Sequence, residues 1–216
     1  MIIILFGAPG SGKGTQAKEI SEYFNIRRIS LGDILREEVK RKSSLGSQVK
    51  QFMEKGVLVP DSIVGEVVKN NIPEGGFVLD GYPRNINQAK YLDEVLLQRK
   101  KKIDTALYLD VDEPTVLKRL EFRRVCRNCS ANYHLINMPP KVEGVCDVCG
   151  GELIQRKDDT PSVIKERLKV FLSESRPLLQ FYKDKGVLIN IDARDEKDEV
   201  FSRIRKAIED GRYIKQ

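Results

Sequence analysis

Long hydrophobic runs are missing from this chain of 216 residues. No segment approaches the roughly 20 consecutive apolar residues that a membrane-spanning helix needs, which excludes proteins with helical membrane spans. The apolar stretch at the N-terminus lacks a basic leader and continues directly into a glycine-rich loop, so we do not interpret it as a signal peptide. We therefore expect a cytoplasmic protein that does not act at a membrane.

Histidine is almost absent, and repeats and low-complexity tracts are not found. His134 is the only histidine, and no Ser-His-Asp or Cys-His arrangement is visible. We therefore expect His134 to pack or to stack on a ligand rather than to transfer protons. The hydrophobic content of 40% and the charged content of 32% are typical of a globular protein, and the length suits one domain with insertions.

The charge balance is only moderately basic, with 38 basic and 32 acidic residues and a net charge of +6. Such a balance suits either nucleic acid or small polyphosphates as partners. A mixed, solvated surface explains most of the lysines. We interpret the basic run 99–102 in this way, as a solvated loop rather than a binding patch.

The chain does contain a phosphate-binding loop. Residues 7–15 read Gly-Ala-Pro-Gly-Ser-Gly-Lys-Gly-Thr and follow the apolar run Ile2–Phe6. Glycines let backbone N–H groups converge on phosphate oxygens, and the N-terminus of the following helix adds positive potential. In the strict pattern Ser or Thr directly follows the lysine and holds Mg²⁺. Here Gly14 separates Lys13 from Thr15, a variant that favours phosphotransferases acting on small acceptors.

Short apolar runs alternate with longer helical patterns along the chain. This alternation predicts an α/β protein, a P-loop three-layer fold with a central parallel sheet of five strands. The predicted strands are Ile2–Phe6, Arg28–Ser30, Phe77–Leu79, Ala106–Asp110 and Val187–Ile191. The predicted helices are Thr15–Phe24, Asp33–Lys40, Leu45–Lys55, Asp61–Asn71, Asn87–Gln98, Pro114–Phe122, Val163–Lys185 and Val200–Ile208. Pro177 falls within the long helical pattern, and we expect it to kink or interrupt that helix.

Two segments break the alternation. Residues 30–59 carry two successive helical patterns with no strand between them, and residues 122–159 carry the cysteines, two adjacent prolines and several glycines. We interpret both as insertions that act as lids over a site. The predicted core is then 1–29, 60–121 and 160–216.

The four cysteines form two C-x₂-C pairs separated by 16 residues, Cys126, Cys129, Cys146 and Cys149. Such spacing is typical of a tetrahedral zinc site, and because all four ligands are cysteines we expect a structural rather than a catalytic metal. Reduced cysteines without metal would leave the spacing unexplained, and a cytoplasmic location argues against disulfides. Thiolate ligation alone also allows iron or cobalt. A zinc ribbon can bind nucleic acid, which is a competing hypothesis from another functional class.

Several further charged residues fall at the edges of the insertions. Asp80 ends a buried strand near the predicted phosphate loop, where it can reach Mg²⁺ directly or through water. Gly81 and Pro83 favour a tight turn that directs Arg84 into the cleft, and Arg119 and Arg123 lie four apart, which predicts a shared helix face. Phosphoryl transfer requires positive charge around the transferred group, and guanidinium groups provide it. Other candidates are Arg36, Arg156 and Arg167.

Taken together, these motifs resemble the adenylate kinase family, in its long bacterial form with a zinc-binding lid. The resemblance covers nearly the whole chain. It rests on residues 7–15, 32–36, 80–84 with Gln88, 119–124, the four cysteines, 139–141 and 156–159. It implies reversible transfer between MgATP and AMP to give two ADP, for adenine nucleotide homeostasis, by a monomer that binds small nucleotides and no nucleic acid. It also implies a helical AMP-binding insertion and a zinc-containing lid.

The resemblance also implies residue roles. Lys13 and the loop amides would hold the ATP phosphates, and Asp80 would position Mg²⁺ through water. The implied catalytic residues are Lys13, Arg84, Arg123, Arg156 and Arg167. The implied ATP-binding residues are Gly10, Ser11, Gly12, Lys13, Gly14, Thr15, Arg119, Arg123, Tyr133, His134 and Arg194. The implied AMP-binding residues are Leu31, Arg36, Val57, Val59, Gly81, Arg84, Gln88, Arg156 and Arg167, with Gln88 reading the acceptor adenine.

Three positions depart from the family pattern. Leu31 and Asn85 stand where threonine is common, and Ala193 replaces a frequent glycine near the ATP adenine. A related pyrimidine-monophosphate kinase family carries asparagine at the position of Asn85, so a UMP/CMP kinase is the alternative within the class, although Gln88 favours adenine. A zinc-ribbon nucleic-acid-binding protein with a nucleotide switch is the alternative from another class.

Overall fold

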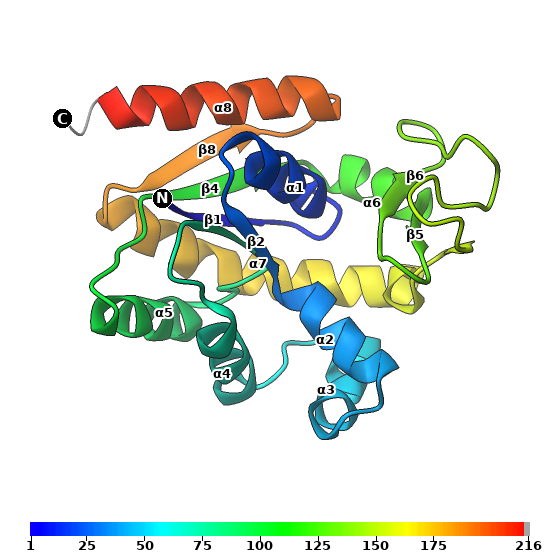
Figure 1. Cartoon of the computed structure of the whole chain (residues 1–216), viewed down its shortest axis with the longest axis horizontal. Helices are drawn as coiled ribbons and strands as arrows, with labels where there is room; N and C mark the ends of the chain where they lie inside the picture. The colour runs from blue at the N-terminus through cyan, green and yellow to red at the C-terminus, as the bar shows by residue number, and fades with distance from the viewer. Residues whose placement is uncertain (214–216) are drawn as a thin grey trace.

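Five parallel strands form the central sheet of the computed structural model, which describes residues 1–213 (Figure 1). Their order is β2-β3-β1-β4-β8. The strands are β1 (Ile2–Gly7), β2 (Arg27–Ser30), β3 (Phe77–Asp80), β4 (Thr105–Asp110) and β8 (Leu188–Asp192). The predicted five-stranded parallel sheet is confirmed. Residues 214–216, the end of the predicted core, lie outside the described part of the chain.

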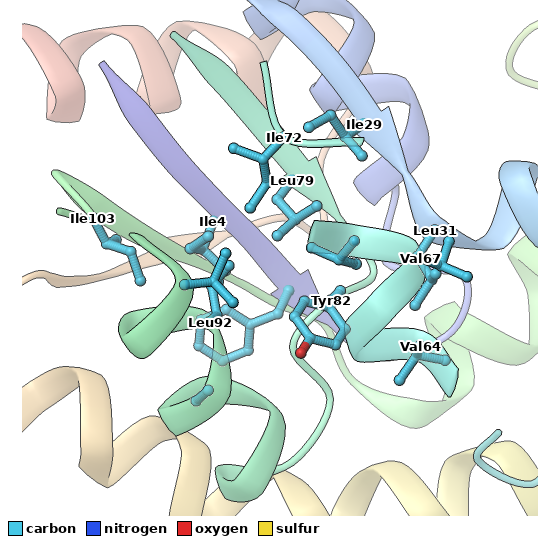
Figure 2. Close-up of a cluster of buried hydrophobic side chains, with 14 of the residues drawn as sticks. Ile4, Ile29, Leu31, Val64, Val67, Ile72, Leu79, Tyr82, Leu92 and Ile103 are labelled. Atoms are coloured by element: carbon cyan, nitrogen blue, oxygen red, sulfur yellow. The ribbon is translucent and has the colours of Figure 1, made fainter. Parts of the chain in front are cut away.

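Helices cover both faces of the sheet (Figure 1). Side chains of β1 alternate, so Ile3 and Leu5 pack against α1 (Lys13–Tyr23) and α8 (Lys197–Tyr213). Ile4 faces the opposite layer, made of α4 (Asp61–Asn71), α5 (Ile86–Gln98) and α7 (Pro161–Asp184). Figure 2 shows Ile4 in this second cluster with Leu79, Tyr82 and Leu92. Burial of each side chain of this size contributes about 1.5–3 kcal/mol to the stability of the fold. The two clusters therefore hold the sheet and its helices together beneath the site.

Residues 30–59 form two helices, α2 (Leu31–Lys40) and α3 (Ser44–Lys55), as predicted. Serine caps begin both: Ser30 Oγ accepts from the Asp33 amide at 3.4 Å, and Ser43 Oγ accepts from the Gly46 amide at 2.9 Å. The helices cross closely at Gly46, where a Cβ would lie 2.1 Å from the Glu38 carbonyl oxygen. Only glycine permits this approach, which keeps the two helices together.

Residues 122–159 contain a small antiparallel sheet of three strands, β5 (Arg123–Cys126), β6 (Asn132–His134) and β7 (Leu153–Ile154), ordered β6-β5-β7. A short 3₁₀ helix, η1 (Lys157–Asp159), closes the segment. The prediction that Arg119 and Arg123 share a helix face is wrong. Helix α6 (Glu113–Glu121) ends before Arg123, which instead begins β5 and pairs with His134. The spacing suggested a helix because it cannot show where the backbone turns into a strand.

Pro177 does not interrupt its helix. Helix α7 runs unbroken over 24 residues, Pro161–Asp184. Proline removes one hydrogen bond to the carbonyl four residues earlier, here that of Ser173. Both Pro177 and Ser173 are exposed, so water can satisfy that carbonyl. Despite the length of α7, no helix within residues 1–213 has both the span and the apolar composition to cross a bilayer.

The basic run 99–102 is partly structural, which corrects its interpretation as a solvated loop. Arg99 donates from Nη1 to the Ile72 carbonyl at 2.9 Å and from Nη2 to the Lys69 carbonyl at 3.0 Å. Lys101 donates to the carbonyls of Pro73 and Glu74. These carbonyls follow or end α4, where a helix leaves acceptors without intrahelical partners. Cations therefore stabilise the end of α4.

Candidate active site

The phosphate loop connects the end of β1 to the start of α1. Gly10 and Gly12 adopt left-handed backbone conformations, with φ of 79° and 94°. These values favour glycine and turn the chain so that α1 begins directly after Gly12. The first turn of α1 has no acidic residue and no side-chain cap. Its free N–H groups are therefore available to an anion.

Lys13 folds back across this loop. Its Nζ donates to the carbonyl oxygens of Gly7 at 2.8 Å and Ala8 at 2.6 Å, and it lies 3.4 Å from Ser11 Oγ. Burial lowers the pKa of Lys13 to about 7, and the nearby Asp80 carboxylate only partly offsets this effect. An ammonium group that lacks a close anionic partner is poised to bind a phosphate.

A cavity of about 230 Å³ opens in front of the loop. Basic side chains dominate its lining and outnumber the acidic ones. The basic residues are Lys13, Arg28, Arg36, Arg84, Arg119, Arg123, Arg156, Arg167 and Lys197, and the acidic residues are Asp33, Asp80, Asp195 and Glu196. The structure therefore brings together all five predicted catalytic residues. Such a lining suits a polyanion of several phosphates.

Asp159 holds two of these arginines in place. Its side chain is fully buried and accepts from Arg123 Nε at 2.8 Å and Nη2 at 2.5 Å, a bidentate pair. Arg167 Nη1 lies 3.3 Å from Asp159 Oδ1 and 3.0 Å from Asp158 Oδ2. Because α7 carries Arg167 and β5 carries Arg123, this carboxylate fixes the spacing between guanidinium groups from two elements.

We expect Asp159→Asn to reduce the free energy of unfolding by about 3 kcal/mol, because it leaves Arg123 without its buried counter-charge and removes one of the two carboxylates beside Arg167. We also expect about a 10- to 100-fold fall in kcat, because misplaced charges lose transition-state contacts. Urea unfolding and steady-state rates measure the two effects. Asp147→Asn, at an exposed aspartate of the same segment, is the matched control. Equal behaviour of the two variants would refute the positioning role.

Asp80 and Asp33 share one arginine. Arg28 Nη2 donates at 2.9 Å to Asp80 Oδ2 and at 2.9 Å to Asp33 Oδ2. Arg36 also bonds Asp33, at 2.5 Å, and together these guanidinium groups hold the pKa of Asp33 below its usual value. Asp80 ends β3 beside the loop, 3.6 Å from where a Cβ of Gly14 would lie. A carboxylate at this place suits a divalent cation bound through water.

The segment that contains the small antiparallel sheet also lines the cavity, through Asn132, Tyr133, His134, Asn137, Met138 and Arg156. Tyr133 and His134 line it, as predicted, and Arg156 Nη2 donates to Asn132 Oδ1 at 2.9 Å. Burial lowers the pKa of Arg156 to about 9. His134 Nδ1 accepts from the amides of Ile136 and Asn137 at 3.2 and 3.0 Å, and its ring lies 6.0 Å from Phe122. Its contacts include no carboxylate, so they agree with a packing role.

Arg119 and Arg194 occupy different surroundings. Arg119 lines the cavity and donates to the carbonyls of Ala193, Arg194 and Asp195 at 2.8, 2.9 and 3.0 Å. It therefore anchors the segment after β8. The Arg194 side chain is exposed and pairs with Asp192 at 2.5 Å, outside the cavity lining. Its predicted contact with ATP stays a prediction.

The predicted acceptor residues divide into two groups. Arg36, Gly81, Arg84, Arg156 and Arg167 line the main cavity. A second cavity of about 100 Å³ adjoins it and shares Lys13, Gly81, Arg84 and Arg167; its lining adds Leu58 and Phe171. The remaining predicted acceptor residues line neither cavity. Leu31, Val59 and Gln88 are buried, and Val57 is half-buried.

The cysteine sulfurs converge on one point. All four Sγ atoms lie within 4.8 Å of one another, with 3.4 Å between Cys126 and Cys149 and 3.6 Å between Cys129 and Cys146. Four thiolates bound tetrahedrally at 2.3 Å lie about 3.8 Å apart, so the cluster fits a zinc ion. The amides of Asn128 and Cys129 lie 3.4 and 3.5 Å from Cys126 Sγ, and such contacts favour a thiolate there. The Tyr133 hydroxyl lies 3.4 Å from Cys146 Sγ.

Sequence reasoning missed Arg28, Asp33 and Asn132 as cavity residues. Asp33 lay within a quoted motif, three residues before Arg36, and that helical spacing was a usable signal. Arg28 carried only a weak signal, as a charged residue in a strand beside a buried one. Asn132 carried none, because its position depends on how the small sheet docks over the loop.

A phosphate loop at a helix N-terminus, surrounded by converging arginines and placed beyond the carboxyl ends of a parallel sheet, defines a P-loop phosphotransferase. The sequence model of the adenylate kinase family matches residues 5–187. The chain is 49% identical over 212 residues to the adenylate kinase of Clostridium tetani, which covers 96% of this chain and 98% of that relative. The adenylate kinases of Caldicellulosiruptor bescii and Methanocella arvoryzae are each 48% identical over 212 residues, covering 96% of this chain and 99% and 98% of those relatives.

The chain therefore belongs to the adenylate kinase family, and the resemblance inferred from its motifs is confirmed. It is a nucleoside monophosphate kinase, and its function is that of an adenylate kinase.

Proposed function

We propose that this chain transfers a phosphoryl group reversibly between MgATP and AMP, giving two ADP, with the residue roles set out below. The observation that carries the proposal is the pair of adjoining cavities that share Lys13, Arg84 and Arg167. A donor and an acceptor nucleotide would meet at this shared wall. Transfer in line between two phosphates needs such a junction, with positive charge around it.

The loop and its lysine would bind the donor. Amides of residues 10–15 and Lys13 would hold the ATP phosphates, and Arg119, Tyr133 and His134 would contact the nucleoside end. On the acceptor side, Arg36 and Arg84 would hold the AMP phosphate. Arg123, Arg156 and Arg167 would surround the transferred group. An oxygen of the AMP phosphate attacks the γ-phosphorus as the bond to the β,γ-bridging oxygen breaks, and both products leave as ADP.

This step needs no general base. The attacking phosphate oxygen already carries negative charge, so no proton has to be removed. The lone histidine agrees with this scheme, because His134 uses Nδ1 to accept backbone amides. Catalysis would then rest on positioning and on electrostatic stabilisation of the equatorial oxygens.

Two metals are part of the proposal. Asp80 would hold Mg²⁺ through water, and the bound ion would neutralise charge on the ATP phosphates. The four cysteines would bind a structural Zn²⁺ that stabilises residues 122–159. This segment is too small for a large core, since its buried cluster comprises only Cys126, Tyr133, Cys146 and Leu153.

Residues 30–59 and 122–159 would act as mobile covers on the core formed by 1–29, 60–121 and 160–216. In this structure the two covers touch, because Lys40 Nζ donates to the Arg127 carbonyl at 3.3 Å. The second cover also touches the core through a hydrogen bond between Asn137 and Glu196. Closure would exclude water and so suppress ATP hydrolysis. A monomer in the cytoplasm stays the expectation.

Measuring ADP formation from MgATP with AMP, UMP, CMP and GMP as separate acceptors, beside a reaction without acceptor, tests this function. We expect a strong preference for AMP. Preference for UMP or CMP would favour the pyrimidine alternative. If folded protein with metal bound transferred phosphate to none of the acceptors, the kinase assignment of this chain would be refuted and a binding protein would be favoured.

A further inference from the structure

The side chain of Gln88, the residue expected to read the acceptor base, is held at both ends of its amide. Gln88 is only 2% exposed. Its Oε1 accepts from the backbone amide of Arg84 at 2.8 Å, and its Nε2 donates to Asp61 Oδ1 at 2.7 Å. The Tyr82 hydroxyl donates to the Gln88 carbonyl at 3.2 Å, which also holds the backbone.

These partners determine which way the amide points. A carboxylate can only accept, and a backbone N–H can only donate, so the reversed amide would set oxygen against Asp61 and N–H against N–H at Arg84. An isolated glutamine could rotate its amide to suit either kind of base. Gln88 instead holds its amide in one orientation, and in that orientation one N–H of Nε2 and one acceptor position of Oε1 are left for a ligand.

Asp61 is itself fixed by its surroundings. It is the first residue of α4, where the helix N-terminus favours a negative charge. Asn85 Nδ2 donates to both of its oxygens, at 3.0 and 3.2 Å. Asn85 Oδ1 in turn accepts from the Gln88 amide at 2.9 Å and caps α5. Both ends of the Asn85 side chain thus contact the protein, and they hold Asp61 and the start of α5 in place.

We propose that Asp61 determines the acceptor base of this enzyme by locking the Gln88 amide in the orientation that selects an amino base. The inference rests on the proposed function and on contact between Gln88 and the acceptor base. In this orientation Oε1 can accept from an exocyclic amino group, while Nε2 donates to an adjacent ring nitrogen. Adenine offers this pair on its Watson–Crick edge.

The corresponding oxo base reverses the pattern. Inosine monophosphate has the size and shape of AMP but carries a carbonyl oxygen in place of the amino group and a hydrogen on the ring nitrogen. Against the locked amide, the carbonyl oxygen of the base would face the acceptor Oε1 and its ring N–H would face the donor Nε2, so neither hydrogen bond could form. Sites built to hydrogen-bond a ligand reject analogues that leave their polar groups unpaired by up to about 10⁴-fold. Among pyrimidines, CMP offers the amino pattern and UMP the oxo pattern.

The test replaces Asp61 with asparagine and compares AMP with inosine monophosphate. The asparagine amide can present oxygen or N–H, so residue 61 then accepts either orientation of the Gln88 amide, and only the Arg84 backbone N–H still opposes its reversal. We expect the wild type to prefer AMP by at least about 10³-fold in kcat/KM, and Asp61→Asn to reduce this preference by about 10- to 100-fold. The change should lie in KM, with kcat for AMP kept within about threefold. Calorimetric binding of both monophosphates without donor gives a readout independent of turnover.

Matched variants separate selectivity from stability. Glu113→Gln removes a charge from the first turn of α6, where Glu113 is the equivalent first residue, and should leave the preference unchanged. Asn85→Ser keeps a capping oxygen but removes the donor to Asp61, and the preference should change less than about threefold because the Asp61–Gln88 bond remains. Asp61→Ser provides a second side chain that can donate or accept, should the asparagine variant fold poorly.

The outcomes are distinguishable. A reduced preference for AMP, with a parallel fall of the CMP to UMP ratio, supports the inference. An unchanged preference in folded Asp61→Asn and Asp61→Ser overturns it and leaves the proposed function standing. A wild type that transfers to neither AMP nor inosine monophosphate would instead remove the proposed function.

Discussion

Replacing Lys13 with methionine should reduce phosphoryl transfer by at least about 10³-fold and leave the protein folded. Lys13 is the only lysine in the phosphate loop, and its Nζ rests on loop carbonyls beside the cavity. A phosphate bound there would attract the ammonium group more strongly as charge redistributes during transfer. Methionine preserves the length of the chain without its charge. Single-turnover rates with MgATP and AMP measure the loss.

The same substitution should stabilise the ligand-free protein in a pH-dependent way. Burial lowers the pKa of Lys13 to about 7, whereas an unfolded lysine titrates near 10.4. Between these two pH values the unfolded chain binds more protons than the folded protein does. The free energy of unfolding therefore rises with pH in this range, as the buried lysine loses its charge. Below pH 7 the buried Lys13 is charged, and it lowers the free energy of unfolding by its full amount. We therefore expect a higher Tm for Lys13→Met than for wild type near pH 6, and a smaller difference near pH 9.

Lys18→Met is the matched control for both effects. Lys18 lies on the same helix but is exposed, and its Nζ is 3.8 Å from Glu22. We expect its rates and its Tm to stay close to those of the wild type. Near-normal turnover of Lys13→Met would refute the loop assignment. A Tm gain that grows with pH would contradict the assigned pKa shift.

Cys129→Ser should lower the metal content and reduce Tm by at least about 5 °C, with a smaller effect on turnover in the cold. The antiparallel sheet of residues 122–159 buries few apolar side chains, so the metal is expected to supply much of its stability. Below the melting range the remaining ligands and the packing over the cavity can still hold the cover closed. Metal analysis, calorimetry and rates at low temperature provide the three measurements.

Chelation and reloading of the wild type provide the control for this variant. Stripped protein should melt like Cys129→Ser, and added Zn²⁺ should restore Tm only in the wild type. A cobalt-loaded sample should show the thiolate charge-transfer bands of a tetrahedral site, weakened in the variant. Loss of turnover with metal retained and Tm unchanged would mean that the cluster is catalytic, contrary to the structural role.

Local sequence patterns predicted much of the architecture. The central strands β1, β3 and β4 were found because their apolar runs are continuous and short. Most helix boundaries agree within a few residues because caps such as Ser43 act on their own neighbours. The predictions were wrong where one local pattern is compatible with two structures. The spacing of Arg119 and Arg123 fits one helix, but the chain turns at Phe122. Pro177 ends many helices, but exposure of its partner carbonyl makes it tolerable here.

The phosphate loop and the two pairs of cysteines could be identified from the sequence, because they depend on contiguous backbone or on fixed spacing. Which charged side chains meet depends instead on how the elements pack. Asp159 joins Arg123 across 36 positions, Asp80 joins Arg28 across 52, and Asp61 joins Gln88 across 27. Such pairs form because strands and helices pack side by side. The sequence around a carboxylate does not show which cationic side chain this packing will bring next to it.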